Sequence, residues 1–326
     1  MRGGRSARVE IQWFMPFPKH FDGKRFFNPG APQAPGFLDV LRWRLGTRPE
    51  RSAPFVSDVK PSKPPSSVDA NQLHVTLINH STLLLQQAGI HILTDPVWSR
   101  RTSPFSWAGP RRRREPGVRW EDLPRIDIVL LSHNHYDHLD LATLRRLAAK
   151  SQSQFVVPSG VARLLRHENI GPVHELDWGD SLPLGGMTIH GVPALHFSAR
   201  GLFDRNRTLW CGYTIEAADR IVYFAGDTAF GAHFAQIREH FGPPHLALLP
   251  IGAYAPRWFM SPVHMAPDEA VRAHQILAAQ TSIAIHHGTF QLGDDAIDTP
   301  RRELRACAPG DSFLILNNGE SVTLPA

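Results

Sequence analysis

One segment constrains this chain more than any other. Residues 126–131 read IDIVLL, and residues 132–140 read SHNHYDHLD. The apolar run is typical of a strand that is buried on both faces, as in the sheets of layered α/β proteins. Three histidines and two aspartates follow within eight positions, and buried imidazoles and carboxylates are costly unless they are paired or bind a metal. The segment therefore predicts a layered fold with a polar centre at a strand end.

The spacing H-x-H-x-D-H suits metal binding. Alternate side chains of an extended segment share a face, so His133 and His135 can point to one side. Asp137 and His138 follow at the turn into a predicted helix and can approach from a second direction. Imidazole and carboxylate together favour zinc, with iron, manganese or nickel as alternatives. The competing interpretation is a polar loop that caps the helix through Asp140.

Polar residues also follow three other apolar runs. The run VPALHFS leads to His196, VYFAGDT leads to Asp227, and SIAIHHG leads to His286 and His287. Each histidine alone is more often a hydrogen-bonded structural residue. Because layered α/β sites are assembled from several strand ends at one edge, we expect these residues to converge. Strand alternation lets only one of the two adjacent histidines face the centre, and the motif favours His286.

Composition bounds the class of protein. The 326 residues are 42% hydrophobic and 20% charged, which is ordinary for a globular chain. The two cysteines, Cys211 and Cys307, are far apart and predict neither a disulfide framework nor a thiolate metal site. The net charge of +5 suits an anionic partner without choosing between phosphate, a phospholipid surface and nucleic acid.

No apolar run approaches the ~20 residues of a membrane-spanning helix, and the first 20 residues lack the apolar core of a signal peptide. We therefore expect a cytoplasmic protein whose membrane contact, if it has any, is peripheral.

The chain divides into two unequal parts. Residues 1–70 are rich in Pro, Gly, Arg and Ser and predict a loop-rich N-terminal arm, partly packed on the core, with one short helix over residues 37–46. Residues 71–326 alternate strand and helix patterns and predict one sheet-centred α/β or α+β domain. Within it we expect a hairpin turn near Ala218 and Asp219 and a closing hairpin over residues 313–324.

The motif SHNHYDH, a later strand-end histidine, a GDT aspartate and a late IH-x-G resemble the metallo-β-lactamase fold superfamily. Longer segments, among them LTDPVWSRRTSPFSWAGPRRRR, ELDWGD, LPIGAYAPRWFM and AIHHGTF, resemble the N-acyl-phosphatidylethanolamine-hydrolysing phospholipase D family. The likeness runs from about residue 72 to residue 320. The family usually has glycine where Asn79 stands and tryptophan where His287 stands, and the N-terminal 65 residues match weakly apart from RFFNP.

The resemblance implies a four-layer αββα sandwich that holds two Zn²⁺ along one edge of its two sheets. The implied ligands are His133, His135 and His196 for one zinc, Asp137, His138 and His286 for the other, and Asp227 as the bridge. A water shared by two zinc ions loses a proton near pH ~7. The metal-bound hydroxide would then attack phosphorus in a phospholipase D reaction that yields phosphatidate and an N-acylethanolamine.

Further residues are expected to support this chemistry. Asp137 and Asp227 would act in catalysis through the metals, and His264 would orient the substrate or protonate the leaving group. Asp95 and His80 would orient the ligands from outside, and Arg257 would contact phosphate. The alternatives are a capping or turn role for Asp95 and His80, a simple helix-entry role for His264, and a structural ion pair for Arg257.

The run RRRR at residues 111–114 is either a solvated face or an attraction for anionic lipid head groups, worth about 1 kcal/mol per charge near a membrane. Phe105 and Trp107 lie just upstream as interfacial anchors would.

Three rival functions share these features. The same fold can carry a metal-dependent lactonase, thioesterase or other ester hydrolase. A nuclease is compatible with the charge, but the sequence has no basic platform with interleaved aromatic residues, so no nucleic-acid partner is expected. A non-enzymatic metal scaffold or sensor is disfavoured because every implied ligand position carries a competent residue.

Overall fold

The computed structural model describes residues 19–46, 55–56, 58–217, 220–307 and 310–325. The strands of this part of the chain form two seven-stranded sheets. In order across the first sheet they are β14 (Ser321–Leu324), β1 (Leu73–Asn79), β2 (Thr82–Gln87), β3 (Ile90–Thr94), β4 (Ile128–Leu130), β5 (Gln154–Pro158) and β6 (Val173–Leu176). Across the second they are β13 (Phe313–Leu314), β12 (Thr281–Ile285), β11 (Leu246–Pro250), β10 (Arg220–Phe224), β9 (Gly212–Ala217), β8 (Met187–Val192) and β7 (Ser181–Leu184).

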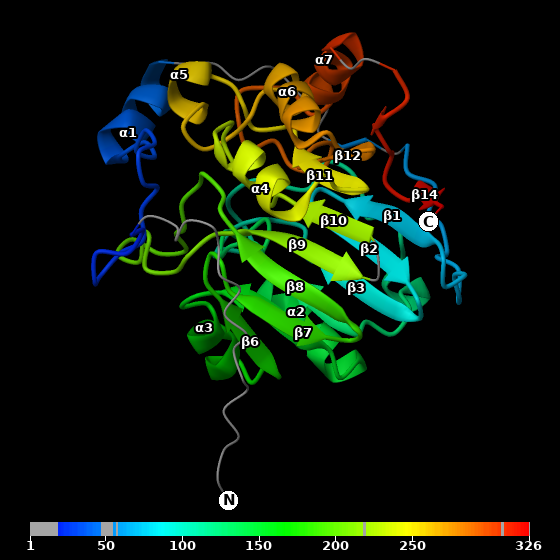
Figure 1. Ribbon diagram of the computed structural model, residues 1–326. Helices are drawn as coiled ribbons and strands as arrows, with labels where there is room; N and C mark the ends of the chain where they lie inside the picture. Colours follow the sequence, from blue (N-terminus) through cyan, green and yellow to red (C-terminus); the bar gives the residue numbers. More distant parts are fainter. Residues whose placement is uncertain (1–18, 47–54, 57, 218–219, 308–309, 326) are drawn as a thin grey trace, which may run out of the picture.

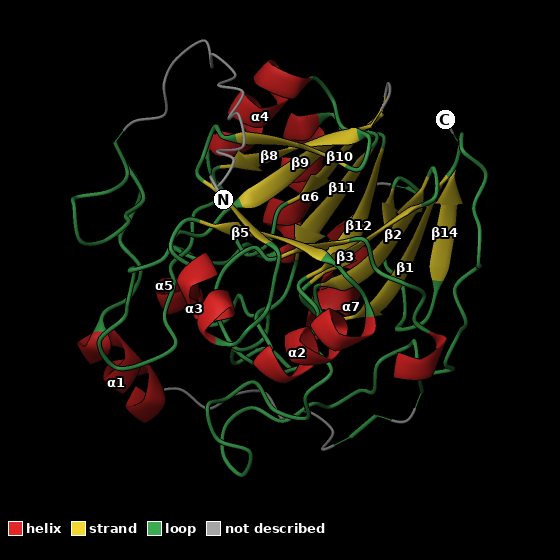
Figure 2. Ribbon diagram, turned by 90° about the horizontal axis from the view of Figure 1, so that it is seen from below, coloured by secondary structure: helices red, strands yellow, loops and turns green. Residues whose placement is uncertain are grey.

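Helices cover the outer face of each sheet (Figures 1 and 2). The first sheet carries α2 (Leu141–Lys150) and α3 (Ala162–His167), and the second carries α4 (His233–Phe241), α6 (Pro267–Leu277) and α7 (Thr299–Cys307). The short helices α1 (Phe37–Gly46), α5 (Arg257–Met260) and the 3₁₀ turn η1 (Trp120–Asp122) complete the described elements. None of the helices in these ranges is long and apolar enough to cross a membrane.

Three apolar clusters hold the layers together. The central cluster joins the inner faces of both sheets, with Leu130 from the first and Leu248 from the second. A second cluster packs Val129 against Leu144 of α2, and a third packs the second sheet against α4, α6 and α7. The expected αββα sandwich is therefore confirmed.

Strand β4 behaves as its sequence predicts. It pairs in parallel with β3 and β5, and its three residues are all buried. Ile128 and Leu130 face the central cluster while Val129 faces α2, as the period of two requires. Asp140 caps α2 by accepting a hydrogen bond from the backbone N–H of Ala142 at 3.1 Å. The histidine cluster is thus fixed between a buried strand and a capped helix.

The predicted closing hairpin is wrong. β13 pairs with β12 in the second sheet, whereas β14 pairs with β1 in the first. The turn residues between them do separate two strands, as predicted. The partner of each strand, however, depends on which sheet edge is open to it, and local sequence does not show this. The other predicted turn, at Ala218 and Asp219, lies outside the described residues, although the flanking β9 and β10 are antiparallel as expected.

The described part of the N-terminal arm touches the domain at several points. Its helix α1 matches the predicted range. Phe26 joins the central cluster, and buried Asn28 donates to the carbonyl of His196 at 2.9 Å and accepts from the indole of Trp210 at 3.0 Å. The arm therefore supports a loop that the sequence analysis assigned to the metal centre. The domain boundary at residue 70 stays a prediction.

Candidate metal centre

Loops at one edge of the sandwich bring the predicted residues together. His133–His138 follow β4, Asp95 follows β3, and His286 follows β12. His196 and Asp227 were expected at the last residues of their strands. They lie instead in the loops that follow β8 and β10. The described residues contain four overlapping groups of candidate ligands, and within each group the ligand atoms lie within 4.8 Å of one another. They are His80–Asp137–His138–His286, His133–His135–His196, Asp95–His133–His138 and His196–Asp227–His264.

Three imidazoles form the first group. The Nε2 atom of His133 lies 2.8 Å from Nδ1 of His135, and Nε2 of His196 lies 3.2 Å from that same atom. In two of the rings the other nitrogen is held elsewhere, since His133 Nδ1 contacts Ser132 Oγ at 2.9 Å and His196 Nδ1 contacts the carbonyl of Val263 at 2.9 Å. Three nitrogen atoms therefore face a common point, as ligands of one cation would.

The second group gathers three imidazoles around one carboxylate. Oδ2 of Asp137 lies 3.1 Å from His80 Nε2, 3.2 Å from His138 Nε2 and 3.3 Å from His286 Nε2. His80 was expected to lie outside the ligands, but its ring nitrogen is as close to Asp137 as those of the other two.

Asp227 lies between the two groups. Its Oδ2 atom is 3.1 Å from His286 Nε2 and 3.2 Å from His138 Nε2 on one side. On the other side it is 3.7 Å from His196 Nε2 and 4.0 Å from His133 Nε2. Its Oδ1 atom is buried with no hydrogen-bond partner among the described residues. A carboxylate in this place can bridge two cations because both oxygens can coordinate.

Electrostatics favours cations here. Burial lowers the pKa of His135 to about 3 and that of His196 to about 4, so these rings are neutral and offer lone pairs. Burial, the largest single influence, would raise the pKa of Asp137 and Asp227. The surrounding histidines, His138 and His286 above all, together outweigh burial and hold both pKa values well below 3.8. The same carboxylates raise the pKa of His138 well above 6.5 and that of His286 to about 9, so these two rings hold positive charge between them. A divalent metal ion can take over that positive charge, and imidazole with carboxylate is a donor set that suits it.

Backbone geometry marks the same place. His80, Asp95 and His286 have φ values of 47°, 33° and 58°, in the left-handed region that non-glycine residues rarely adopt. Such conformations cost about 1–3 kcal/mol each and persist where the surroundings impose them, often at functional sites.

Asp95 orients one of the candidate ligands. Its Oδ2 atom lies 2.6 Å from His138 Nδ1 and accepts a hydrogen bond from Ser132 Oγ at 2.6 Å. This arrangement directs His138 Nε2 toward Asp137 and Asp227. Carboxylate support of this kind fixes the tautomer of a metal-binding histidine.

His264 lies beside the centre. Its Nδ1 atom is 3.9 Å from Asp227 Oδ2, and its ring stacks 5.2 Å from that of His286. The predicted phosphate contact, Arg257, is instead ion-paired with Glu269 at 2.7 Å and donates to the carbonyl of His264 at 3.1 Å. The structure thus gives Arg257 a supporting position behind His264, and its contact with substrate stays a prediction.

His287 points away from the centre. Its Nε2 atom lies 3.1 Å from the carbonyl of Ala284, and burial holds its pKa well below 6.5. This placement agrees with the expected choice of His286.

The tetra-arginine run divides between interior and surface. Buried Arg112 donates to Asn79 Oδ1 at 3.1 Å and to the carbonyl of Val97 at 2.9 Å. Buried Arg114 pairs with Asp58 at 2.7 Å and Asp298 at 3.1 Å. Only Arg111 and part of Arg113 are exposed, so the reading of the whole run as a surface feature is wrong for half of it.

Comparisons with known proteins agree with this geometry. Residues 91–287 match the family described as "Beta-lactamase superfamily domain". The N-acyl-phosphatidylethanolamine-hydrolyzing phospholipase D 1 of Caenorhabditis elegans is 38% identical over 83% of this chain and 83% of its own length. The chain belongs to the N-acyl-phosphatidylethanolamine-hydrolysing phospholipase D family of the β-lactamase superfamily.

A second curated relative and one solved structure are also similar to this chain. The mitochondrial enzyme of the same name from Saccharomyces cerevisiae is 32% identical over 76% of this chain and 56% of its own length. The crystal structure of an isothiocyanate hydrolase from Delia radicum gut bacteria superposes with a TM-score of 0.62 at 25% identity, over 78% of this chain and 99% of that one. Fold, donor set and relatives together make this phospholipase D family member a metallo-hydrolase.

Proposed function

We propose that the protein is a dinuclear zinc phosphodiesterase of the phospholipase D type. Its substrate would be an N-acyl-phosphatidylethanolamine or a closely similar phospholipid, and its products phosphatidate and an N-acylethanolamine. The observation that carries the proposal is the position of Asp227 Oδ2 between a group of three imidazoles and a second group built on Asp137. The relationship to the C. elegans enzyme supports the choice of substrate.

The residues present would hold two metal ions. His133, His135 and His196 would bind one, Asp137, His138 and His286 the other, and Asp227 both, with His80 as a further donor to the second. Two zinc ions would supply a hydroxide nucleophile near neutral pH and would offset the negative charge that develops on the phosphoryl oxygens.

The remaining side chains would position the reacting groups. His264 lies beside Asp227 with its ring partly accessible, which suits a hydrogen bond to a phosphoryl oxygen or to the leaving oxygen. The Arg257–Glu269 pair would hold His264 in place through its backbone carbonyl. Asp95 would fix the orientation of His138.

Contact with a membrane surface is part of the proposal. Phe105 and Trp107 are 54% and 76% exposed, and Arg111 lies exposed near them in the same loop. Exposed aromatic residues beside cationic ones favour the interface of an anionic bilayer. The protein would accordingly be cytoplasmic and peripheral at the membrane.

The test combines metal content with substrate choice. The protein would be purified without chelator, its metals quantified, and its activity measured on an N-acyl-phosphatidylethanolamine, bis-p-nitrophenyl phosphate, a simple lactone and an aryl isothiocyanate. The proposal expects about two zinc ions per chain and preferred turnover of the lipid, abolished by Asp227→Asn.

Other results would lead elsewhere. Two metals with turnover of only the lactone, an ester or the isothiocyanate would establish the alternative, a metal-dependent hydrolase of another substrate class. Fewer than about one metal per chain, not restored by added zinc, would overturn the dinuclear centre itself.

A further inference from the structure

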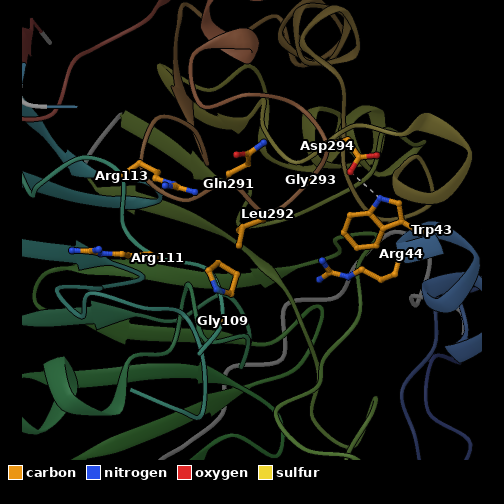
Figure 3. A pocket seen from close by; sticks show the side chains of 10 residues that line it. Trp43, Arg44, Gly109, Arg111, Arg113, Gln291, Leu292, Gly293 and Asp294 are labelled. Atoms are coloured by element: carbon orange, nitrogen blue, oxygen red, sulfur yellow. Dashed lines mark hydrogen bonds between the residues drawn. The ribbon is translucent and has the colours of Figure 1, made fainter. Parts of the chain in front are cut away.

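A second site lies apart from the metal centre. A cavity of about 360 Å³ opens between α1 and the loop that contains the arginine run. Its walls are Trp43 and Arg44 of α1, residues 109–111 and Arg113 of the loop, and residues 291–294 beyond β12 (Figure 3). It shares no lining residue with the candidate metal ligands.

The lining of this cavity is strongly cationic. Arg44, Arg111 and Arg113 contribute three guanidinium groups, against the one carboxylate of Asp294. That carboxylate accepts a hydrogen bond from Trp43 Nε1 at 3.0 Å, which also ties α1 to the domain. In Figure 3, Arg44 enters from the α1 side and Arg113 from the opposite side, with Leu292 between them, while the guanidinium of Arg111 extends away from the middle of the cavity. Cationic side chains in the walls of a cavity favour an anion there.

The neighbouring arginines differ from those that line the cavity, because their guanidinium groups already have partners inside the domain. Arg112 and Arg114 are used by buried carbonyl and carboxylate groups of the domain. Among the described residues, by contrast, no carboxylate pairs with Arg44 or Arg111, and the Arg44 guanidinium lies over the ring of Trp43 at 4.7 Å from its centroid. Planar guanidinium groups match phosphate oxygens with paired hydrogen bonds. The arginines that line the cavity therefore suit a phosphate group.

The surroundings of the cavity are apolar and exposed. On α1, Phe37, Leu38 and Leu45 are 80%, 77% and 79% exposed, and Trp107 of the loop is 76% exposed. No residue of α1 is fully buried. If the phosphate group of a phospholipid entered the cavity between α1 and the loop, its apolar chains would lie next to these exposed side chains.

We propose that the cavity binds a phosphate group, separately from any phosphodiester at the metal centre. Two sources share this chemistry: the head group of a phospholipid at a membrane surface, and free inorganic phosphate. Binding here requires no turnover and would hold the protein at a phosphate-bearing surface or respond to dissolved phosphate.

The test uses the metal-loaded protein and two double variants. Arg44→Gln with Arg111→Gln removes two charges from the cavity, whereas Arg119→Gln with Arg305→Gln removes two exposed charges elsewhere. A third double variant, with Arg44→Lys and Arg111→Lys, keeps the charge but loses the planar fork. One arm measures flotation with phosphatidylcholine vesicles that contain phosphatidic acid, against phosphatidylcholine alone. The other arm is a calorimetric titration with inorganic phosphate.

The cavity variant should bind about tenfold or more weakly than the wild type and the charge-matched control, with the lysine variant in between. A loss in the vesicle arm alone assigns a lipid head group, and a loss in both arms assigns phosphate from either source. A loss in the phosphate titration alone assigns free phosphate. Phosphate that binds at the metal centre affects all four proteins alike, so the differences between them decide. Equal binding by the cavity variant and the control in both arms would overturn the inference, provided that both keep the wild-type melting temperature.

Discussion

The Nδ1 atom of His138 lies 2.6 Å from Oδ2 of Asp95, and both side chains are completely buried. This contact leaves only Nε2 of the imidazole to face Asp137 and Asp227. Removing the carboxylate would free the ring to rotate and to change tautomer.

We therefore expect Asp95→Ala to weaken metal binding about 10- to 100-fold, as measured by competition with a chelating dye. Asp95→Asn keeps an oxygen acceptor and should weaken it less. Exposed Asp69→Ala is the matched control. Equal metal affinity in Asp95→Ala and the control would show that the contact serves stability alone.

Asp227 should be indispensable for the pairing of the two groups. Asp227→Asn removes the charge while keeping the shape, so we expect both a lower metal content and at least about a hundredfold loss of hydrolysis. Metal analysis of the purified variant is the primary measurement, with Asp268→Asn on the exposed side of α6 as control. Wild-type metal content and activity in Asp227→Asn would contradict a bridging role.

Arg257 allows its two interpretations to be separated kinetically. If it supports His264 through the carbonyl contact at 3.1 Å, Arg257→Met should lower kcat about tenfold to a hundredfold with little change in KM. Glu269→Gln should act in the same direction because it releases the guanidinium. A large increase in KM for the phospholipid alone would instead restore direct contact between Arg257 and phosphate.

Adjacent arginines should differ sharply in their effect on stability. The guanidinium of Arg112 is buried and bonded to Asn79 and Val97, so Arg112→Gln should lower the free energy of unfolding by about 1–3 kcal/mol. Exposed Arg111→Gln should change it by less than about 0.5 kcal/mol. Urea unfolding followed by linear extrapolation measures both. A similar loss in the two variants would refute the division of the run into buried and exposed positions.

The Arg114–Asp58 pair predicts a specific acid dependence. The hydrogen bond from Arg114 holds the pKa of Asp58 below 3.8. Because the folded-state pKa is the lower one, this carboxylate stabilises the fold above the unfolded pKa, and the contribution is lost as pH falls through the folded value. The difference in unfolding free energy between wild type and Asp58→Asn should be constant from about pH 8 to 5 and shrink below about pH 4. A difference that grows on acidification would contradict the sign of the shift.

Much of the centre could be predicted because its signals are local. The buried strand, the H-x-H-x-D-H spacing and the cap at Asp140 lie within thirteen consecutive residues, 128–140, and each follows from residue type and period. His196, Asp227 and His286 were found from apolar runs that end in polar residues. The helix at 37–46 followed from its amphipathic spacing.

Two contacts at the centre had no such local signal. Asn28 is 168 positions from His196 along the chain, and His80 was expected outside the ligands rather than beside Asp137. Whether each arginine of the run is buried or exposed depends on contacts with residues distant in the sequence, namely Asn79 for Arg112 and Asp58 and Asp298 for Arg114. Asn79 is itself a departure from the family pattern.

The sequence by itself determined the layered class of this protein, its family and the residue types of its candidate metal centre, because periodicity and motif spacing act over short stretches of chain. Only the tertiary structure decided that β13 and β14 join different sheets, that His80 reaches Asp137, and that Arg112 is buried while Arg111 borders a cavity. These outcomes depend on which distant groups satisfy each buried charge or open sheet edge, and that is settled when the layers pack.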